Sequence, residues 1–110
     1  MDVSAESFQS AVIERSRELP VIVDFWAPWC GPCHALAPVL EQEVERRGGA
    51  VELVKVNVDD SPELASRYAV SGIPSVKAFS DGAVVNQFVG AMPPAVVSGF
   101  LDAIVDDVAV

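Results

Sequence analysis

Two cysteines separated by two residues, Cys30 and Cys33, are the side chains of this 110-residue chain best suited to chemistry. They are its only cysteines. As a structural cross-link, the pair would close a very short loop and would remove little entropy from the unfolded chain. In a reducing compartment such a pair is more often catalytic or metal-binding than structural. The spacing therefore predicts a functional dithiol.

The cysteines are predicted to lie at the beginning of a helix. A β-branched run over residues 21–25 is typical of a central strand, and apolar residues at helical spacing predict a helix over 31–47. Unpaired N–H groups and the positive end of the helix dipole then point at the Cys30 sulfur and favour its thiolate. Gly31-Pro32 defines the first turn, which keeps Cys33 within reach of Cys30.

Asp24 is the one charged residue of the predicted central strand. Burying a carboxylate among valine, phenylalanine and tryptophan is costly unless the group is paired or takes up a proton. Because this strand leads directly into the cysteine loop, Asp24 is a candidate to accept a proton from Cys33. The alternative is a structural ion pair with Lys55, the only cation of the adjacent predicted strand, and the two roles are compatible.

The remaining elements are predicted from apolar periodicity and turn residues. Helices are expected over 7–17, over 61–69 with Ser61 as cap, and from 93 onward, and strands over 51–58, 75–79 and 83–89. Asp81-Gly82 predicts a hairpin. Pro38 is expected to kink its helix, and Gly48-Gly49 to stop it. This order predicts an α/β fold with a mixed sheet, in a single domain over residues 1–110.

Composition and charge exclude two classes of function. The net charge is −9, and nucleic-acid binding requires a basic surface. The sequence contains no apolar stretch long enough to span a bilayer. Residues 1–4 lack the basic start and apolar run of a secretory signal, so a cytoplasmic protein is expected.

The segment from Val23 to Cys33, Val-Asp-Phe-Trp-Ala-Pro-Trp-Cys-Gly-Pro-Cys, resembles the active-site signature of the thioredoxin family. The likeness continues through residues 55–59, 72–75, 81–82 and 89–91. It implies the thioredoxin fold, in which helices flank a central mixed sheet on both faces. It also implies a protein-disulfide reductase that works through a mixed disulfide with its client proteins.

The resemblance assigns a role to each matching residue. Cys30 is implied to be the attacking nucleophile, Cys33 the resolving cysteine and Asp24 the buried acid that assists it. Pro74 corresponds to the family's cis-proline. The implied substrate groove is lined by Trp29, Ile73, Pro74, Val89, Gly90 and Ala91, and the implied supporting residues are Trp26, Gly31, Pro32, His34 and Lys55. Electrons are implied to come from NADPH through a thioredoxin reductase, with no bound cofactor and no metal, and a monomer is expected.

Two features depart from the usual family pattern. His34 follows the second cysteine where the family usually has a basic residue, and a histidine is only partly charged at neutral pH. Residues 7–20 and 88–93 also resemble the thioredoxin-like domain of a bacterial co-chaperone that normally carries a helical repeat region, which is absent from this sequence. A chaperone-like module that forms mixed disulfides with unfolded clients is therefore the alternative function.

Metal binding is a weaker alternative. His34 completes a Cys-x-x-Cys-His string, the attachment pattern of c-type haem, but haem attachment needs export and an axial ligand, and Met92 is the only internal methionine. Structural zinc usually takes four ligands, whereas the chain has two cysteines and one histidine. An iron–sulfur cluster shared across a dimer is the last of these alternatives.

Overall fold

The computed structural model describes residues 2–109, and the side chains of residues 2–105. The helical elements are α1 (Ala5–Phe8), continued by the π-helix η1 (Gln9–Glu14) and the 3₁₀ helix η2 (Arg15–Arg17), then α2 (Gly31–Glu45), α3 (Pro62–Arg67) and α4 (Pro94–Ala109). The strands are β1 (Val21–Trp26), β2 (Glu52–Asn57), β3 (Ser75–Ser80) and β4 (Ala83–Val89). None of the described helices is long and apolar enough to cross a membrane.

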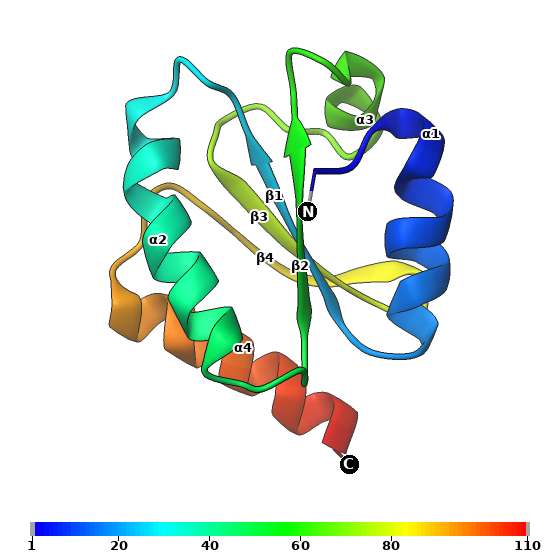
Figure 1. The fold of residues 1–110 in the computed structure, drawn as a ribbon, viewed down its shortest axis with the longest axis vertical. Coiled ribbons are helices and arrows are strands. Elements are labelled where there is room, and N and C mark those ends of the chain that lie inside the picture. The colour runs from blue at the N-terminus through cyan, green and yellow to red at the C-terminus, as the bar shows by residue number, and fades with distance from the viewer. Residues whose placement is uncertain (1, 110) are drawn as a thin grey trace.

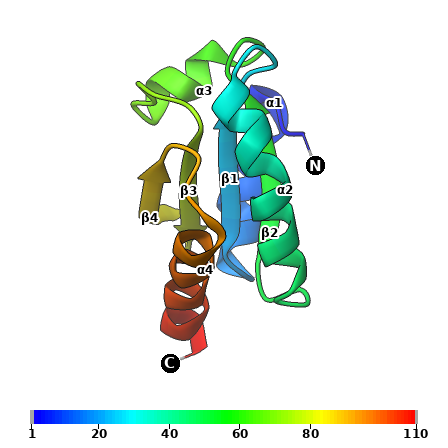
Figure 2. The ribbon, with the colours of Figure 1, turned by 90° about the vertical axis from the view of Figure 1, so that its left-hand side faces the viewer.

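The strands form one mixed sheet in the order β2-β1-β3-β4. β1 is parallel to β2 and antiparallel to β3, and β3 and β4 pair as an antiparallel hairpin. Figure 1 shows the sheet between α2 and α4 on one side and α1 and α3 on the other. In Figure 2, α2 and α4 cover the face of the sheet that is turned toward the viewer. The predicted α/β architecture with helices on both faces is confirmed, whereas the single-domain extent stays a prediction.

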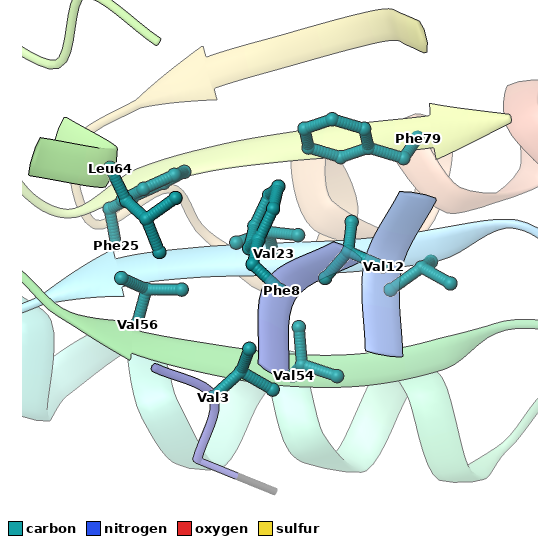
Figure 3. Packing of buried hydrophobic residues seen from close by; sticks show 10 residues of the cluster. Val3, Phe8, Val12, Val23, Phe25, Val54, Val56, Leu64 and Phe79 are labelled. Carbon is teal, nitrogen blue, oxygen red and sulfur yellow. The ribbon is translucent and has the colours of Figure 1, made fainter. Parts of the chain in front are cut away.

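The side chains of β1 alternate between two apolar clusters. Val21, Val23 and Phe25 belong to the cluster that contains Phe8, Val12 and Leu64 of α1, η1 and α3. Figure 3 shows Val23 and Phe25 on this face of the sheet. Ile22 packs on the opposite face, beneath α2 and α4. The first cluster also contains Val3, Val54, Val56 and Phe79. Because both faces are covered, the strand is apolar throughout except at Asp24, which confirms the predicted central strand.

The first helix begins at Ala5, two residues before its predicted start at residue 7. Ser4 has an extended backbone, and its N–H donates to Ser7 Oγ at 3.2 Å. The Ser7 N–H in turn donates to the Ser4 carbonyl oxygen at 3.2 Å. These reciprocal bonds satisfy groups that a helix start leaves open, so the helix begins earlier than its apolar spacing indicates.

Helix α2 continues through Pro38 and ends at Glu45, two residues before its predicted bound. Gly48 and Gly49 follow with φ of +53° and +93°. This left-handed region favours glycine and terminates helices, so the predicted glycine stop is confirmed. The kink at Pro38 stays a prediction.

The turns around α3 and the hairpin give two corrections and one confirmation. Ser61 precedes α3, but its hydroxyl makes no capping hydrogen bond, so the predicted side-chain cap is wrong. Its carbonyl oxygen accepts the Leu64 N–H at 3.1 Å instead. The helix ends at Arg67, and Ala69 has φ +54°, which is incompatible with the predicted continuation to residue 69. Asp81 and Gly82 have φ of +51° and +83°, which confirms the predicted hairpin turn.

Charged side chains join the end of α2 to α4. Arg47 Nη1 donates to Glu43 Oε1 at 3.2 Å, and the Glu43 side chain is buried. Arg47 Nη2 donates to Asp102 Oδ1 at 2.6 Å and to the Ser98 carbonyl oxygen at 3.0 Å. Arg46, whose side chain is exposed, also reaches Glu43 Oε2 at 3.2 Å. The Arg47 guanidinium therefore partners a buried carboxylate and ties two helices together.

Replacing Arg47 with methionine is expected to lower the free energy of unfolding by about 2 kcal/mol, because Glu43 stays buried with only the exposed Arg46 as its partner. Denaturant unfolding at neutral pH measures this loss. The matched control is Arg46→Met, which removes an exposed charge and should cost less than about 1 kcal/mol. Equal losses in the two variants would contradict the role of Arg47.

Candidate active site

Cys30 and Cys33 form a disulfide at the start of α2. Cys30 is the N-cap residue, and the Cys33 N–H donates to its Sγ at 3.2 Å. Gly31 and Pro32 form the first turn, as predicted. Both cysteine side chains are buried in this oxidised state. After reduction, the helix dipole and the Cys33 N–H both favour negative charge on the Cys30 sulfur.

A second loop brings Ile73 and Pro74 beside the disulfide. The Ile73–Pro74 peptide bond is cis, which confirms the expectation from the family resemblance. Ile73 packs against the cluster formed by Ala27 and the two cysteines. Its carbonyl oxygen lies 3.9 Å from Cys30 Sγ, although the two residues are 43 positions apart in the sequence.

The end of β4 lies against this loop. The Gly90 N–H donates to the Pro74 carbonyl oxygen at 2.8 Å, and Gly90 has φ +101°, a conformation that favours glycine. Val89 and Ala91, on either side of Gly90, are exposed. The structure therefore brings Val89, Gly90 and Ala91 to the predicted place beside Pro74. Their role in substrate binding stays a prediction.

Trp29 lies next to the cysteines and is 70% exposed. Its indole N–H donates to Asp59 Oδ2 at 2.9 Å, which fixes one edge of the ring. Asp59 ends the segment 55–59 that resembles the family, but its residue type alone predicts no role for it. The bond joins residues 30 positions apart, so no local pattern reveals it.

Asp24 is buried, with 1% of its surface exposed, as predicted. Its Oδ1 atom has no hydrogen-bond partner among the described residues. Burial raises the pKa of Asp24 to about 6; the nearby charge of Lys55 opposes this rise and that of Glu41 adds to it. A carboxyl group that titrates near neutral pH is suited to general acid–base chemistry.

Lys55 does not form an ion pair with Asp24, which was the alternative role considered for this carboxyl group. The two residues are opposite each other in the parallel register of β1 and β2. The Lys55 ammonium binds Glu41 Oε2 instead, at 3.0 Å, and lies 5.9 Å from the centroid of the Trp26 ring. The Lys55 side chain stays 22% exposed in this arrangement. A partly hydrated ammonium is less costly than one buried beside Asp24, which is why the structure does not support the alternative of a direct pair.

Trp26 and His34 lie together beside the cysteines. Trp26 is the last residue of β1, one residue beyond the strand predicted over 21–25. Its ring meets the His34 ring edge-on at a centroid distance of 6.1 Å. His34 Nε2 lies 2.7 Å from the Pro28 carbonyl oxygen. Because a carbonyl oxygen only accepts, Nε2 carries the hydrogen. The effect of His34 on the Cys30 thiolate stays a prediction.

The described part of the chain contains no ligand cluster that would support the metal alternatives. Among those residues, no three histidine, cysteine, aspartate or glutamate side chains gather in a group that could hold a metal ion. His34 uses its Nε2 on the Pro28 carbonyl oxygen.

Comparison with known proteins places this site in a family. The Thioredoxin family model matches residues 1–103. The chain is 43% identical to Thioredoxin 1 of Synechococcus elongatus over 100 residues. These residues make up 91% of this chain and 92% of that protein. It is also 43% identical, with the same coverage, to the thioredoxin of Synechocystis sp.. Over 94 residues it is 45% identical to the thioredoxin of Streptomyces clavuligerus, covering 86% of this chain and 85% of that protein.

These names favour an oxidoreductase over the chaperone-like alternative. The likeness to a co-chaperone domain stays a prediction. The structure of this chain places a cis-proline loop beside the disulfide at the start of α2. The chain therefore belongs to the thioredoxin family and is a protein dithiol/disulfide oxidoreductase of the thioredoxin type.

Proposed function

We propose that this chain reduces the disulfides of client proteins by two successive thiol–disulfide exchanges. The Cys30 thiolate attacks one sulfur of the client disulfide, and the other client sulfur leaves as a thiolate. The mixed disulfide is then attacked at Cys30 Sγ by the Cys33 thiolate, which releases the client's second sulfur. Two electrons pass to the client, and the Cys30–Cys33 disulfide is formed.

The observation that carries this proposal is the Cys30–Cys33 disulfide at the start of α2. The N-cap position supplies the helix dipole and the Cys33 N–H to one sulfur only, that of Cys30. This asymmetry supports Cys30 as the attacking thiolate and Cys33 as the resolving cysteine.

In the second exchange Asp24 accepts the proton of the Cys33 thiol. The support for this role is that Asp24 is buried in β1, whose end leads into the cysteine loop, and that its Oδ1 atom lacks another partner among the described residues. With a pKa raised to about 6, the carboxylate is available at neutral pH and is more basic than an exposed aspartate.

The client chain binds beside the disulfide, across Trp29, Val89, Ala91 and the Ile73-Pro74 loop. Trp29 and Val89 are large apolar side chains that are 70% and 54% exposed, as expected for a surface that is covered only when a client is bound. The position of a Cβ atom on Gly31 is open, with no atom within 4 Å, so a client backbone can approach the first turn.

Electrons reach the chain from NADPH through a thioredoxin reductase, and the chain itself works as a cytoplasmic monomer without a bound cofactor. Membership of the thioredoxin family supports this route.

Incubation of the chain with NADPH, a bacterial thioredoxin reductase and insulin tests the proposal. Without insulin, NADPH oxidation is expected to stop after about one equivalent per chain, which reduces the Cys30–Cys33 disulfide. Sustained oxidation is expected only when both the chain and insulin are present. The control is the chain reduced and alkylated with iodoacetamide, which keeps the sequence but blocks both sulfurs. NADPH consumption that continues with the alkylated chain would contradict the proposal.

A further inference from the structure

Three charged side chains from three elements meet beneath α2. Asp24 lies on β1, Lys55 lies opposite it on β2, and Glu41 reaches Lys55 from α2. The Lys55 ammonium lies 3.0 Å from Glu41 Oε2, whereas Asp24 Oδ1 has no hydrogen-bond partner among the described residues. One cation therefore faces two carboxyl groups and binds the outer one.

The two carboxyl groups differ in their access to water. The Glu41 side chain is 54% exposed, whereas Asp24 is 1% exposed. A hydrated carboxylate needs little help from a cation, but a buried one without a partner is strongly disfavoured. The observed pairing thus leaves the more costly carboxylate, that of Asp24, without the cation. Asp24 is therefore a stronger proton acceptor than it would be with Lys55 as its partner.

We propose that Glu41 is a positioning residue for the resolving step, because its carboxylate holds the Lys55 ammonium away from Asp24. This inference rests on the proposed function, in which Asp24 accepts the proton of Cys33. Glu41 touches neither a client nor the sulfurs in this scheme and acts only through Lys55 and Asp24.

The surroundings of Asp24 limit which other groups could act in this way. On β3 its partner in the register is Val76, which carries no charge. The Lys55 charge on β2 lowers the pKa of Asp24, and the Glu41 charge on α2 raises it. Asp2 bridges to Lys55 through the backbone at the edge of β2, and its own side chain is exposed.

Replacing Glu41 with glutamine removes a negative charge near Asp24 and frees Lys55 to approach it. Both changes favour the Asp24 carboxylate. We expect the midpoint of Asp24 titration to fall by about one pH unit, as expected when a cation approaches a carboxylate. Lys55→Gln should shift the midpoint in the opposite direction.

The carboxyl carbon signal of Asp24, followed by NMR across pH in the oxidised protein, measures this midpoint without turnover. The matched control is Glu45→Gln, which removes the same charge from an exposed position farther along α2. A Glu41→Gln midpoint equal to that of Glu45→Gln would overturn the inference. An equal shift by Glu41→Gln in the Lys55→Gln background would also overturn it, because Glu41 would then act without Lys55.

A second measurement separates this inference from the proposed function. The pH dependence of mixed-disulfide resolution should shift to lower pH in Glu41→Gln by the same amount as the Asp24 signal. If the signal shifts and the resolution profile does not, Asp24 is not the proton acceptor, and the proposed mechanism fails. If neither shifts while insulin is still reduced, the role of Glu41 fails and the reductase function stands.

Discussion

Replacing Cys33 with serine is expected to stop turnover and to trap client proteins as mixed disulfides. The first exchange still proceeds, because the Cys30 thiolate keeps its position at the start of α2. The second exchange lacks its attacking sulfur, so the covalent intermediate persists. Insulin reduction should fall by about 10³-fold or more, the scale of losing a residue that makes or breaks a covalent bond. Non-reducing gels of a client-rich lysate should show adducts that dithiothreitol releases.

Cys30→Ser is the matched control, since it makes the same change of one atom at the other cysteine. It should abolish turnover as well but should form no adducts, because Cys33 lies inside the first turn and directs its own N–H at Cys30 Sγ. This asymmetry tests the assignment of roles and not only the need for two cysteines. Adducts of equal yield in both variants, or none in Cys33→Ser, would contradict it.

The cysteine site could be predicted from the sequence because its geometry is local. The strand, the loop and the start of the helix follow one another within residues 21–45, so apolar spacing and turn residues place each next to the last. The burial of Asp24 was predictable for a related reason. A strand that is apolar on both faces has no exposed side on which a carboxylate could lie.

Contacts between distant segments could not be predicted in this way. Trp29 meets Asp59 across 30 positions, and Lys55 binds Glu41 rather than Asp24, the only partner that the sequence suggests for it. The register of β1 and β2 does place Lys55 opposite Asp24. The pairing is decided by hydration, since an exposed glutamate on α2 offers the ammonium a partner without burying it. Only the arrangement of β1, β2 and α2 together reveals which carboxyl group Lys55 binds.

Three helix bounds differ by two residues from those that the sequence predicts: the start of α1 and the ends of α2 and α3. Local hydrogen bonds of the backbone and of serine side chains help to decide such bounds. Ser4 and Ser7 bond reciprocally and start α1 early, whereas Ser61 makes no side-chain cap at all. A cap contributes only about 1 kcal/mol, so the surrounding packing readily decides whether a given serine makes one. The apolar spacing that identifies a helix contains no information about this choice.

Replacing Asp24 with asparagine is expected to make the oxidised protein more stable at alkaline pH and slower at reducing disulfides. The pKa of Asp24 is raised from 3.8 to about 6 by burial. A raised pKa means that the folded state prefers the protonated carboxyl. This preference stabilises the protein fully below about pH 4 and is lost as the pH rises through about 6. Above that range the folded protein carries a buried carboxylate without a partner for Oδ1.

The expected size follows from the shift of about two pH units, which corresponds to about 3 kcal/mol. Asparagine is neutral at every pH, so the gain in the free energy of unfolding should approach about 3 kcal/mol at pH 8 and be much smaller near pH 4. Denaturant unfolding of both proteins across this range measures the difference. A difference that does not change with pH would contradict a buried, titrating Asp24.

The same substitution should slow the resolving step at neutral pH by at least about tenfold, because asparagine cannot accept the Cys33 proton. The first attack by Cys30 does not use Asp24 and should keep its rate, which a stopped-flow measurement of mixed-disulfide formation checks. Equal rates for wild type and Asp24→Asn in both steps would remove Asp24 from the mechanism. A higher free energy of unfolding together with a slower resolving step in Asp24→Asn would indicate that the buried carboxyl group is retained for its chemistry although it lowers stability.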